Sequence, residues 1–183
     1  SVAAALPPST AVYAHLSGAS GLDVLSPHAR VGSLHPLMSL PDAETGARRL
    51  RDHCTFAVAG DPFLHDVVRS LGGQVVEVAP SQRTLYHAAA TIAANHLTAL
   101  CAQVERLAAD VGVPVDAYWS MMRNTLDNLE AHGAEAALPG PAARGDWSTV
   151  RDHRHALRSD QDRQFYVACC IAAGRLAGQT IPP

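Results

Sequence analysis

The chain has 183 residues, of which 48% are hydrophobic and 17% charged, so it can bury a core and is neither disordered nor a coiled coil. Its formal charge of -3 at pH 7 provides no broad basic surface and argues against nucleic-acid or acidic-lipid binding. All 14 basic residues are arginine, and this absence of lysine excludes a lysine Schiff base and a P-loop lysine.

Residues 1–80 alternate short apolar runs with turn signals and predict part of an α/β domain. The segment Asp61–Leu71 is expected to be a helix between the last two strands. Repeated strand-helix-strand units of this length favour a mostly parallel sheet. The expected strands are Ala11–Leu16, Arg30–Leu34, Thr55–Ala59 and Gln74–Val78.

Residues 81–183 predict an all-helical domain, with the domain boundary near residue 80. Apolar residues recur about every 3.6 positions and indicate one long helix that ends at Asp110. A second helix follows Pro114 and stops near Gly133. Asp146 is a candidate N-cap for a third helix, and Gln161–Leu176 forms a fourth. The expected fold class is α/β followed by all-α.

Four cysteines are irregularly spaced and lack the paired spacing of zinc or redox sites, so no metal site is expected. They are Cys54, Cys101, Cys169 and Cys170. Buried free thiols in a reducing cytoplasm are the favoured interpretation. No apolar run reaches the roughly 18 residues that span a bilayer, so we expect a cytoplasmic protein without a membrane partner.

Two predicted strands end in segments that contain a histidine and a serine. One segment is His15-Leu16-Ser17-Gly18 and the other is Ser33-Leu34-His35-Pro36. Ligands of open α/β sheets bind outside the carboxyl ends of strands, which favours a shared crevice. In the alternative interpretation, Gly18 and Pro36 only mark turns and the histidines cap them.

Along the long helix, His87, Thr91 and Asn95 recur at every fourth position and are expected on one stripe. This neutral polar stripe is either a functional site or a buried hydrogen-bonding network. Histidine is also the side chain best suited to proton transfer near neutral pH.

The loop Gly140–Asp146 contains Arg144, whose forked guanidinium suits a carboxylate or phosphate. It is equally interpretable as a solvated loop in which Asp146 caps the next helix. Arg123 and Asn128, on the second helix, are weaker candidates of the same kind.

Five motifs in order closely resemble bacterial Rossmann-like proteins whose C-terminal half is a domain of unknown function. These proteins are similar to 6-phosphogluconate dehydrogenase, pyrroline-5-carboxylate reductase and ketopantoate reductase. The motifs are HLSG (His15–Gly18), GSLHPLMS (Gly32–Ser39), YHAAATIAAN (Tyr86–Asn95), RNTLDNL (Arg123–Leu129) and GPAARGD (Gly140–Asp146).

The resemblance implies an NADP-dependent oxidoreductase that acts on a small oxo or hydroxy acid and forms a homodimer through its helical domain. His15, Ser17, Gly18 and Ser33 would then bind the cofactor. Thr91, Arg123, Asn128 and Arg144 would bind the carboxylate substrate. The 6-phosphogluconate dehydrogenase group has an asparagine at Asn95 and a catalytic lysine at Thr91. Without that lysine, His35 and His87 become the acid/base candidates, with Asn95 orienting the substrate.

The chain lacks the opening strand and glycine-rich turn of such proteins, so we expect a fragment of a longer protein. Two further functions are weighed beside the oxidoreductase. One is a non-catalytic dimerisation or ligand-binding module, and the other is a ketopantoate-type reductase in pantothenate synthesis.

Overall fold

The computed structural model describes residues 2–7 and 9–182, which form two compact units. Unit 1 ends at Ala99 and unit 2 begins at Leu100. This division lies within the long helical stretch. The boundary near residue 80, predicted from the sequence, marks instead the change from strands to helices.

Unit 1 contains a four-stranded sheet in the order β1-β2-β3-β4. β1 pairs with β2, and β3 with β4, in parallel, whereas β2 and β3 are antiparallel. The sheet is therefore mostly parallel, as predicted, and each predicted strand is present. The strands are β1 (Tyr13–His15), β2 (Val31–Pro36), β3 (Thr55–Gly60) and β4 (Gln74–Glu77).

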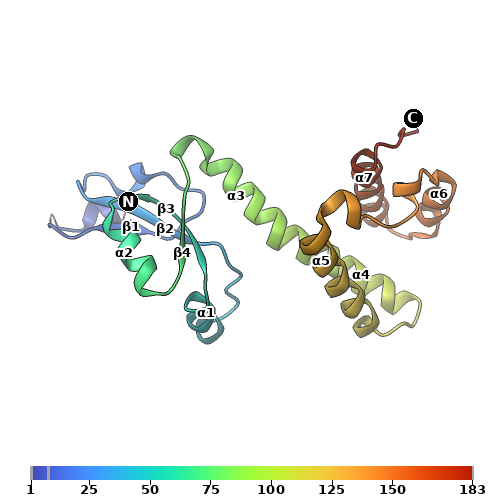
Figure 1. Ribbon diagram of the computed structural model, residues 1–183, viewed down its shortest axis with the longest axis horizontal. Coiled ribbons are helices and arrows are strands. Elements are labelled where there is room, and N and C mark those ends of the chain that lie inside the picture. The colour runs from blue at the N-terminus through green and yellow to red at the C-terminus, as the bar shows by residue number, and fades with distance from the viewer. Residues whose placement is uncertain (1, 8, 183) are drawn as a thin grey trace. The chain divides into compact units, whose positions relative to one another are not determined.

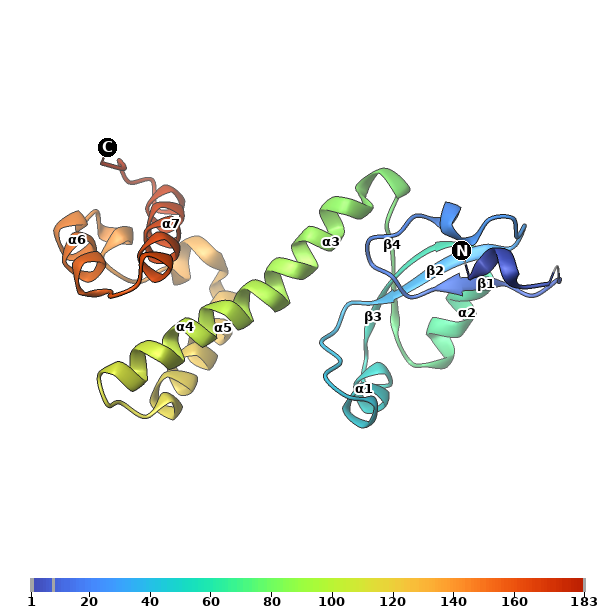
Figure 2. The same cartoon turned by 180° about the vertical axis from the view of Figure 1, so that it is seen from behind.

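Two helices accompany this sheet (Figure 1). α1 (Ala43–Leu50) connects β2 to β3, and α2 (Phe63–Ser70) connects β3 to β4. α2 packs against β2, β3 and β4 and lies beside the sheet in the reverse view as well (Figure 2). The helix predicted over Asp61–Leu71 is thus confirmed with slightly shorter bounds.

The core of unit 1 lies between the sheet and α2. Alternate side chains of a strand point to opposite faces, so Leu34, Phe56 and Val58 share one face. Leu64 and Val68 of α2 pack against these side chains, and Val68 is fully buried. The opposite face therefore carries the intervening side chains of the same strands.

The long helical stretch predicted after Pro80 is present, but it contains a change of helix type. A short 3₁₀ turn (Pro80–Gln82) leads into α3 (Arg83–Thr91). A π-helical turn (Ile92–His96) follows before α4 (Leu97–Asp110). The π turn alters the regular α-helical spacing from which the stripe of His87, Thr91 and Asn95 was predicted.

Unit 2 contains most of α4 together with α5 (Val115–Ala137), α6 (Trp147–Ala156) and α7 (Asp160–Leu176). α4 and α5 lie side by side in both views, with Cys101 Sγ 3.8 Å from Met122 Sδ (Figures 1 and 2). Asp146 caps α6 by accepting a hydrogen bond from Thr149 N at 3.1 Å, as predicted. Hydrogen bonds from the Thr149 hydroxyl, the Ser148 hydroxyl and Thr149 N together lower the pKa of Asp146 to about 2.

All four cysteines are free thiols. Cys54 and Cys170 are buried and Cys101 is half-buried. Cys169 is exposed, so the expectation of buried thiols is wrong at this position, which lies on the outer side of α7. Among the described residues, no helix has both the length and the apolar character needed to cross a bilayer.

Candidate functional site

The face of the sheet opposite α2 carries a row of polar side chains. Ser33 pairs in register with His15 of β1, and His35 follows two positions later on β2. The period-two alternation of a strand therefore turns all three side chains to this face. Ser33 is fully buried, and its hydroxyl has no hydrogen-bond partner among the described residues.

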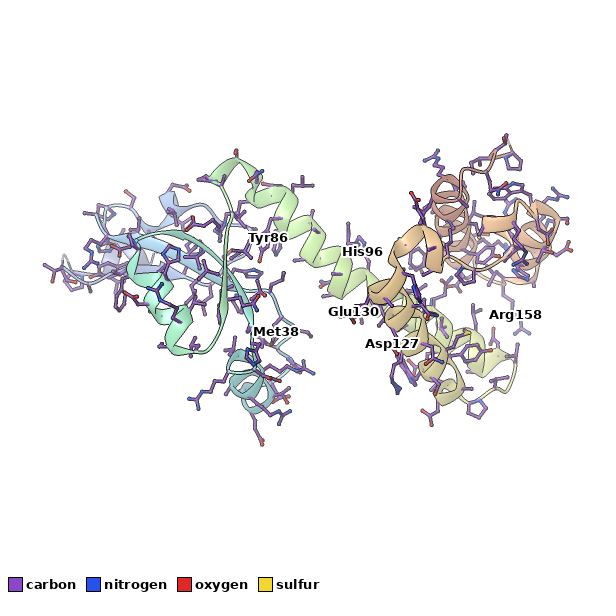
Figure 3. All side chains as sticks on the ribbon, viewed as in Figure 1. Met38, Tyr86, His96, Asp127, Glu130 and Arg158 are labelled. Atoms are coloured by element: carbon purple, nitrogen blue, oxygen red, sulfur yellow. The ribbon has the colours of Figure 1, made fainter. Side chains whose placement is uncertain are left out.

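The start of α3 adds two further side chains to His35. Tyr86, labelled in Figure 3, places its hydroxyl 2.7 Å from His35 Nδ1. The rings of His35 and His87 lie with their centroids 6.1 Å apart and their planes at 71°. Two imidazoles and a phenol from segments about 50 residues apart in sequence are thus gathered at one place.

Gly18 completes this cluster from the loop that follows β1. A Cβ atom at this position would lie 2.5 Å from His87 Cδ2 and 2.8 Å from His35 Nε2. Both distances are too short for any side chain. The backbone at Gly18 can approach both imidazoles only because the residue is glycine.

Arg83, the first residue of α3, contacts the loop that carries Ser17 and Gly18. Its side chain is only 4% exposed, and Nη2 donates a hydrogen bond to Ser17 O at 2.6 Å. Arg83 was not predicted from the sequence as a site residue. An available signal was a cation in the first turn of a helix, where the helix dipole favours anions.

Burial and neighbouring positive charge lower the pKa of His35 and of His15. For His35 the largest cause is burial, followed by the charges of His87 and Arg83. Burial also lowers the pKa of His15, with a smaller contribution from Arg83. Burial raises the pKa of Tyr86, which keeps its hydroxyl protonated. A neutral imidazole can both donate and accept a proton.

His15 and Ser17 are occupied by hydrogen bonds within their own loop. Ser17 N donates to His15 Nδ1 at 3.2 Å, so Nε2 carries the proton and donates to Gly21 O, also at 3.2 Å. The Ser17 hydroxyl accepts from Ser20 N at 3.0 Å. These side chains shape the loop that carries Gly18, and any role toward a cofactor remains a proposal.

The other predicted site residues form no hydrogen bond or ring contact with this cluster among the described residues. Thr91 is half-buried on α3, and Asn95 is exposed on the π turn. Arg123, Asn128 and Arg144 are exposed in unit 2. The structure therefore brings together His35, His87 and Gly18 from the predicted set, and it adds Tyr86 and Arg83.

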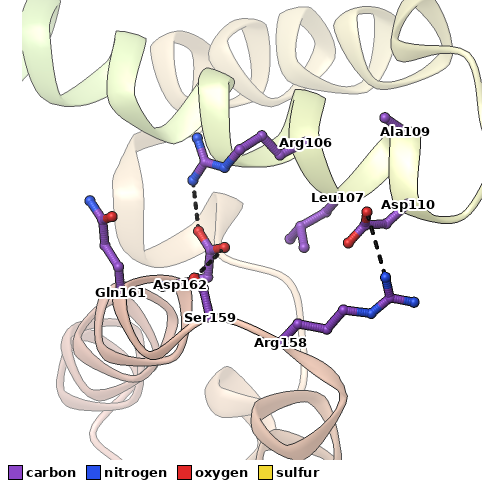
Figure 4. Close-up of a pocket in the computed structure, with 8 residues that line it drawn as sticks. All are labelled: Arg106, Leu107, Ala109, Asp110, Arg158, Ser159, Gln161 and Asp162. Atoms are coloured by element: carbon purple, nitrogen blue, oxygen red, sulfur yellow. Dashed lines mark hydrogen bonds and ion pairs between the residues drawn. The ribbon is translucent and has the colours of Figure 1, made fainter.

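Unit 2 contains a pocket of about 580 Å³ between α4 and the start of α7 (Figure 4). Both of its arginines are already paired. Arg106 Nη2 lies 2.7 Å from Asp162 Oδ1, and Arg158 Nη1 lies 3.9 Å from Asp110 Oδ1. The charged side chains of the pocket are thus paired with one another. The pocket is lined by Arg106, Leu107, Ala109, Asp110, Arg158, Ser159, Gln161 and Asp162.

Comparison with protein families matches residues 54–172 to a domain of unknown function (DUF2520). The chain belongs to the DUF2520 family. No curated protein matches this DUF2520 chain. Two solved structures resemble it closely in fold, so the Rossmann-like α/β sheet with a helical C-terminal region is established.

The first of these structures is protein TM1727 from Thermotoga maritima, with a TM-score of 0.79 and 24% identity. That alignment covers 97% of this chain and 73% of the Thermotoga chain. The second is named "putative NADP oxidoreductase BF3122" and comes from Bacteroides fragilis, with a TM-score of 0.76 and 18% identity. That alignment covers 90% of this chain and 65% of the Bacteroides chain.

Proposed function

We propose that this DUF2520 protein is an NADP-dependent oxidoreductase that acts on a small oxo or hydroxy acid. The observation that carries the proposal is the cluster in which the imidazoles of His35 and His87 meet the backbone of Gly18. The name of the Bacteroides fragilis protein supports the same class of reaction.

In the proposed reaction, His35 is the acid/base group. When the Tyr86 hydroxyl donates to Nδ1, His35 carries its proton on Nε2, the atom that faces Gly18. Nε2 can then give this proton to the substrate oxygen during reduction and take it back during oxidation. His87 is the second candidate, because its ring borders the same position.

The polar residues around Gly18 are the ones we assign to the reacting end of a nicotinamide cofactor. A Cβ at Gly18 would clash with both imidazoles, so glycine lets the loop backbone pack directly against them. NADP, when bound, would supply or accept the hydride, with Ser17, Gly18 and Ser33 nearest to it. The sequence contains no Gly-x-Gly-x-x-Gly turn for a pyrophosphate, so we assign this chain only residues at the reacting end.

Turnover of the protein tests this proposal. NADPH oxidation would be followed with a panel of 2-oxo acids that includes ketopantoate. H35Q and H87Q should each lower kcat by about 100-fold or more, as expected for loss of an acid/base group. H65Q is the matched control, because His65 lies on α2 and bonds Glu77 at 2.8 Å. Unchanged turnover in both H35Q and H87Q contradicts these roles.

A non-catalytic dimerising module is the second candidate, favoured by exposed apolar side chains along the long helix. Leu85 is 76% and Ile92 57% exposed. Exposed apolar surface of this kind is typical of an interface, and a homodimer is the occupant we propose. Light scattering should then give twice the chain mass of 19.3 kDa, and L85E/I92E should give a monomer. A dimer that fails to bind NADPH supports this second candidate over the oxidoreductase.

A further inference from the structure

Arg83 is a buried cation without an acidic partner among the described residues. Its side chain is 4% exposed, yet none of the ion pairs in the described structure includes it. Of its five N–H donors, one bonds Ser17 O, and Nε has no partner within the described residues. We propose that Arg83 binds the carboxylate of the substrate, an inference that rests on the proposed function.

Desolvation is the first argument for an anionic ligand. A buried charge is strongly unfavourable unless a counter-charge or hydrogen bonds compensate it. Arg83 also occupies the first turn of α3, where the helix dipole opposes a cation and favours an anion. A carboxylate bound here satisfies both the guanidinium and the helix terminus.

The surrounding groups do not supply that anion. Arg83 influences the pKa values of His15, His35 and Tyr86, none of which is negative near neutral pH. Asp23 is the carboxylate that acts on His15, but it forms no ion pair with Arg83. The cluster therefore has an excess of positive charge that a carboxylate would neutralise.

The position of Arg83 also matches the chemistry of a 2-oxo acid. Its Nη2 bonds Ser17 O, and the next residue, Gly18, adjoins His35 Nε2, so the guanidinium and the imidazole border the same loop segment. Arg144 is the candidate predicted from the sequence for this role. It is exposed in unit 2, and its charge contributes to the low pKa of Asp146. Arg83 is therefore the better carboxylate anchor.

Binding of small anions to the chain tests this assignment without turnover. We would follow the Cε1–H resonance of His35 by NMR while titrating oxalate, oxamide or inorganic phosphate. Oxalate consists of two directly bonded carboxylates and so resembles the carboxylate and adjacent carbonyl of a 2-oxo acid. Oxamide is its neutral counterpart, and phosphate tests for a general oxyanion site. The variants are R83Q, R83K, the rival R144Q and the control R49Q, whose arginine likewise donates to a carbonyl, Ser39 O.

The proposal expects oxalate to shift the His35 resonance with saturation, and oxamide to have no effect. R83Q should weaken oxalate binding at least 10-fold, and R49Q and R144Q should bind as the wild type does. R83K keeps the positive charge but loses the forked N–H donors of the guanidinium, so oxalate binding should fall several-fold. This variant provides the test if R83Q fails to fold. Unchanged binding in R83K and R83Q, loss in R144Q, or tighter binding of phosphate than of oxalate overturns the assignment.

This experiment separates the two proposals. Oxalate binding that depends on Arg83, in a protein that turns over no 2-oxo acid, would retain the anion site and reject the oxidoreductase. Turnover with an unchanged KM in R83Q would retain the oxidoreductase and reject Arg83 as the carboxylate anchor.

Discussion

The Tyr86 hydroxyl and His35 Nδ1 lie 2.7 Å apart and connect the first turn of α3 to the end of β2. This bond fixes the ring of His35 and leaves Nε2 facing Gly18. The group that we propose as acid/base is therefore oriented by a residue that itself need not contact the substrate. Tyr86 is a positioning residue in this interpretation.

Replacement of Tyr86 by phenylalanine should separate a contribution to stability from a contribution to catalysis. Y86F removes the partner of a half-buried imidazole nitrogen and should destabilise the protein by about 0.5–1.5 kcal/mol. Urea unfolding measures this change, and Y118F is the matched control, since the Tyr118 hydroxyl has no hydrogen bond to a described residue. If Tyr86 positions His35, kcat of Y86F should fall with little change in KM. A stability loss with an unaltered pH profile of kcat would indicate a structural role alone.

The low pKa of His35 predicts a dependence of stability on pH. Because its pKa in the folded protein lies below the ordinary 6.5, the unfolded chain takes up this proton first as the pH falls. The free energy of unfolding should therefore decrease as the pH falls through the ordinary value of 6.5 and remain low below the folded-state pKa. His15 contributes in the same direction.

Urea unfolding of the wild type and H35Q at several pH values measures how much of this pH dependence comes from His35. H35Q removes one titrating group, so its stability should fall less steeply over the same range. A slope in H35Q equal to that of the wild type would show that His35 does not titrate differently in the folded and unfolded states.

The sheet and most helices were predictable because their signals are local. The strand segments have runs of apolar and β-branched residues, and the Asp146 cap directly precedes its helix. α1 was not predicted individually, because its sequence AETGARRL is polar and contains a central glycine. Its N-cap, Asp42, accepts from Thr45 N at 2.7 Å and was the one strong local signal. The π turn at Ile92–His96 has no such signal.

The candidate site was predictable only in part, because some of its properties depend on distant segments. Gly18, His35 and His87 could be selected by residue type and by their positions at strand ends or on a helix. Arg83 is buried against a segment that lies 66 residues earlier, where it bonds Ser17 O. Spacing along the sequence cannot reveal such a contact. His15 and Ser17 were selected by the same strand-end argument, but their side chains bond within the loop.

Gly133 allows a test of a backbone feature of unit 2. Its φ of 77° and ψ of 167° interrupt α5 and lie in a region that essentially only glycine adopts. No atom lies within 4 Å of a Cβ built at this position, so strain rather than a clash decides the effect. G133A should cost about 1–3 kcal/mol in the free energy of unfolding. A stabilised G133A, with increased helical circular dichroism, would show that α5 continues through this residue in solution.

Gly18 provides the sharpest structural test of the site. In G18A the new methyl group would lie 2.5 Å from His87 Cδ2 and 2.8 Å from His35 Nε2, so at least one imidazole must move. Overpacking of this kind should cost about 1–3 kcal/mol and displace the NMR resonances of both histidines. G46A is the matched control, because Gly46 lies within α1 and its Cβ would meet Leu40 at an ordinary 3.7 Å. Alanine there should be neutral or stabilise by up to about 1 kcal/mol. Turnover that survives in G18A, with both histidine resonances displaced, would mean that the contact between the Gly18 backbone and the imidazoles is not required for the reaction.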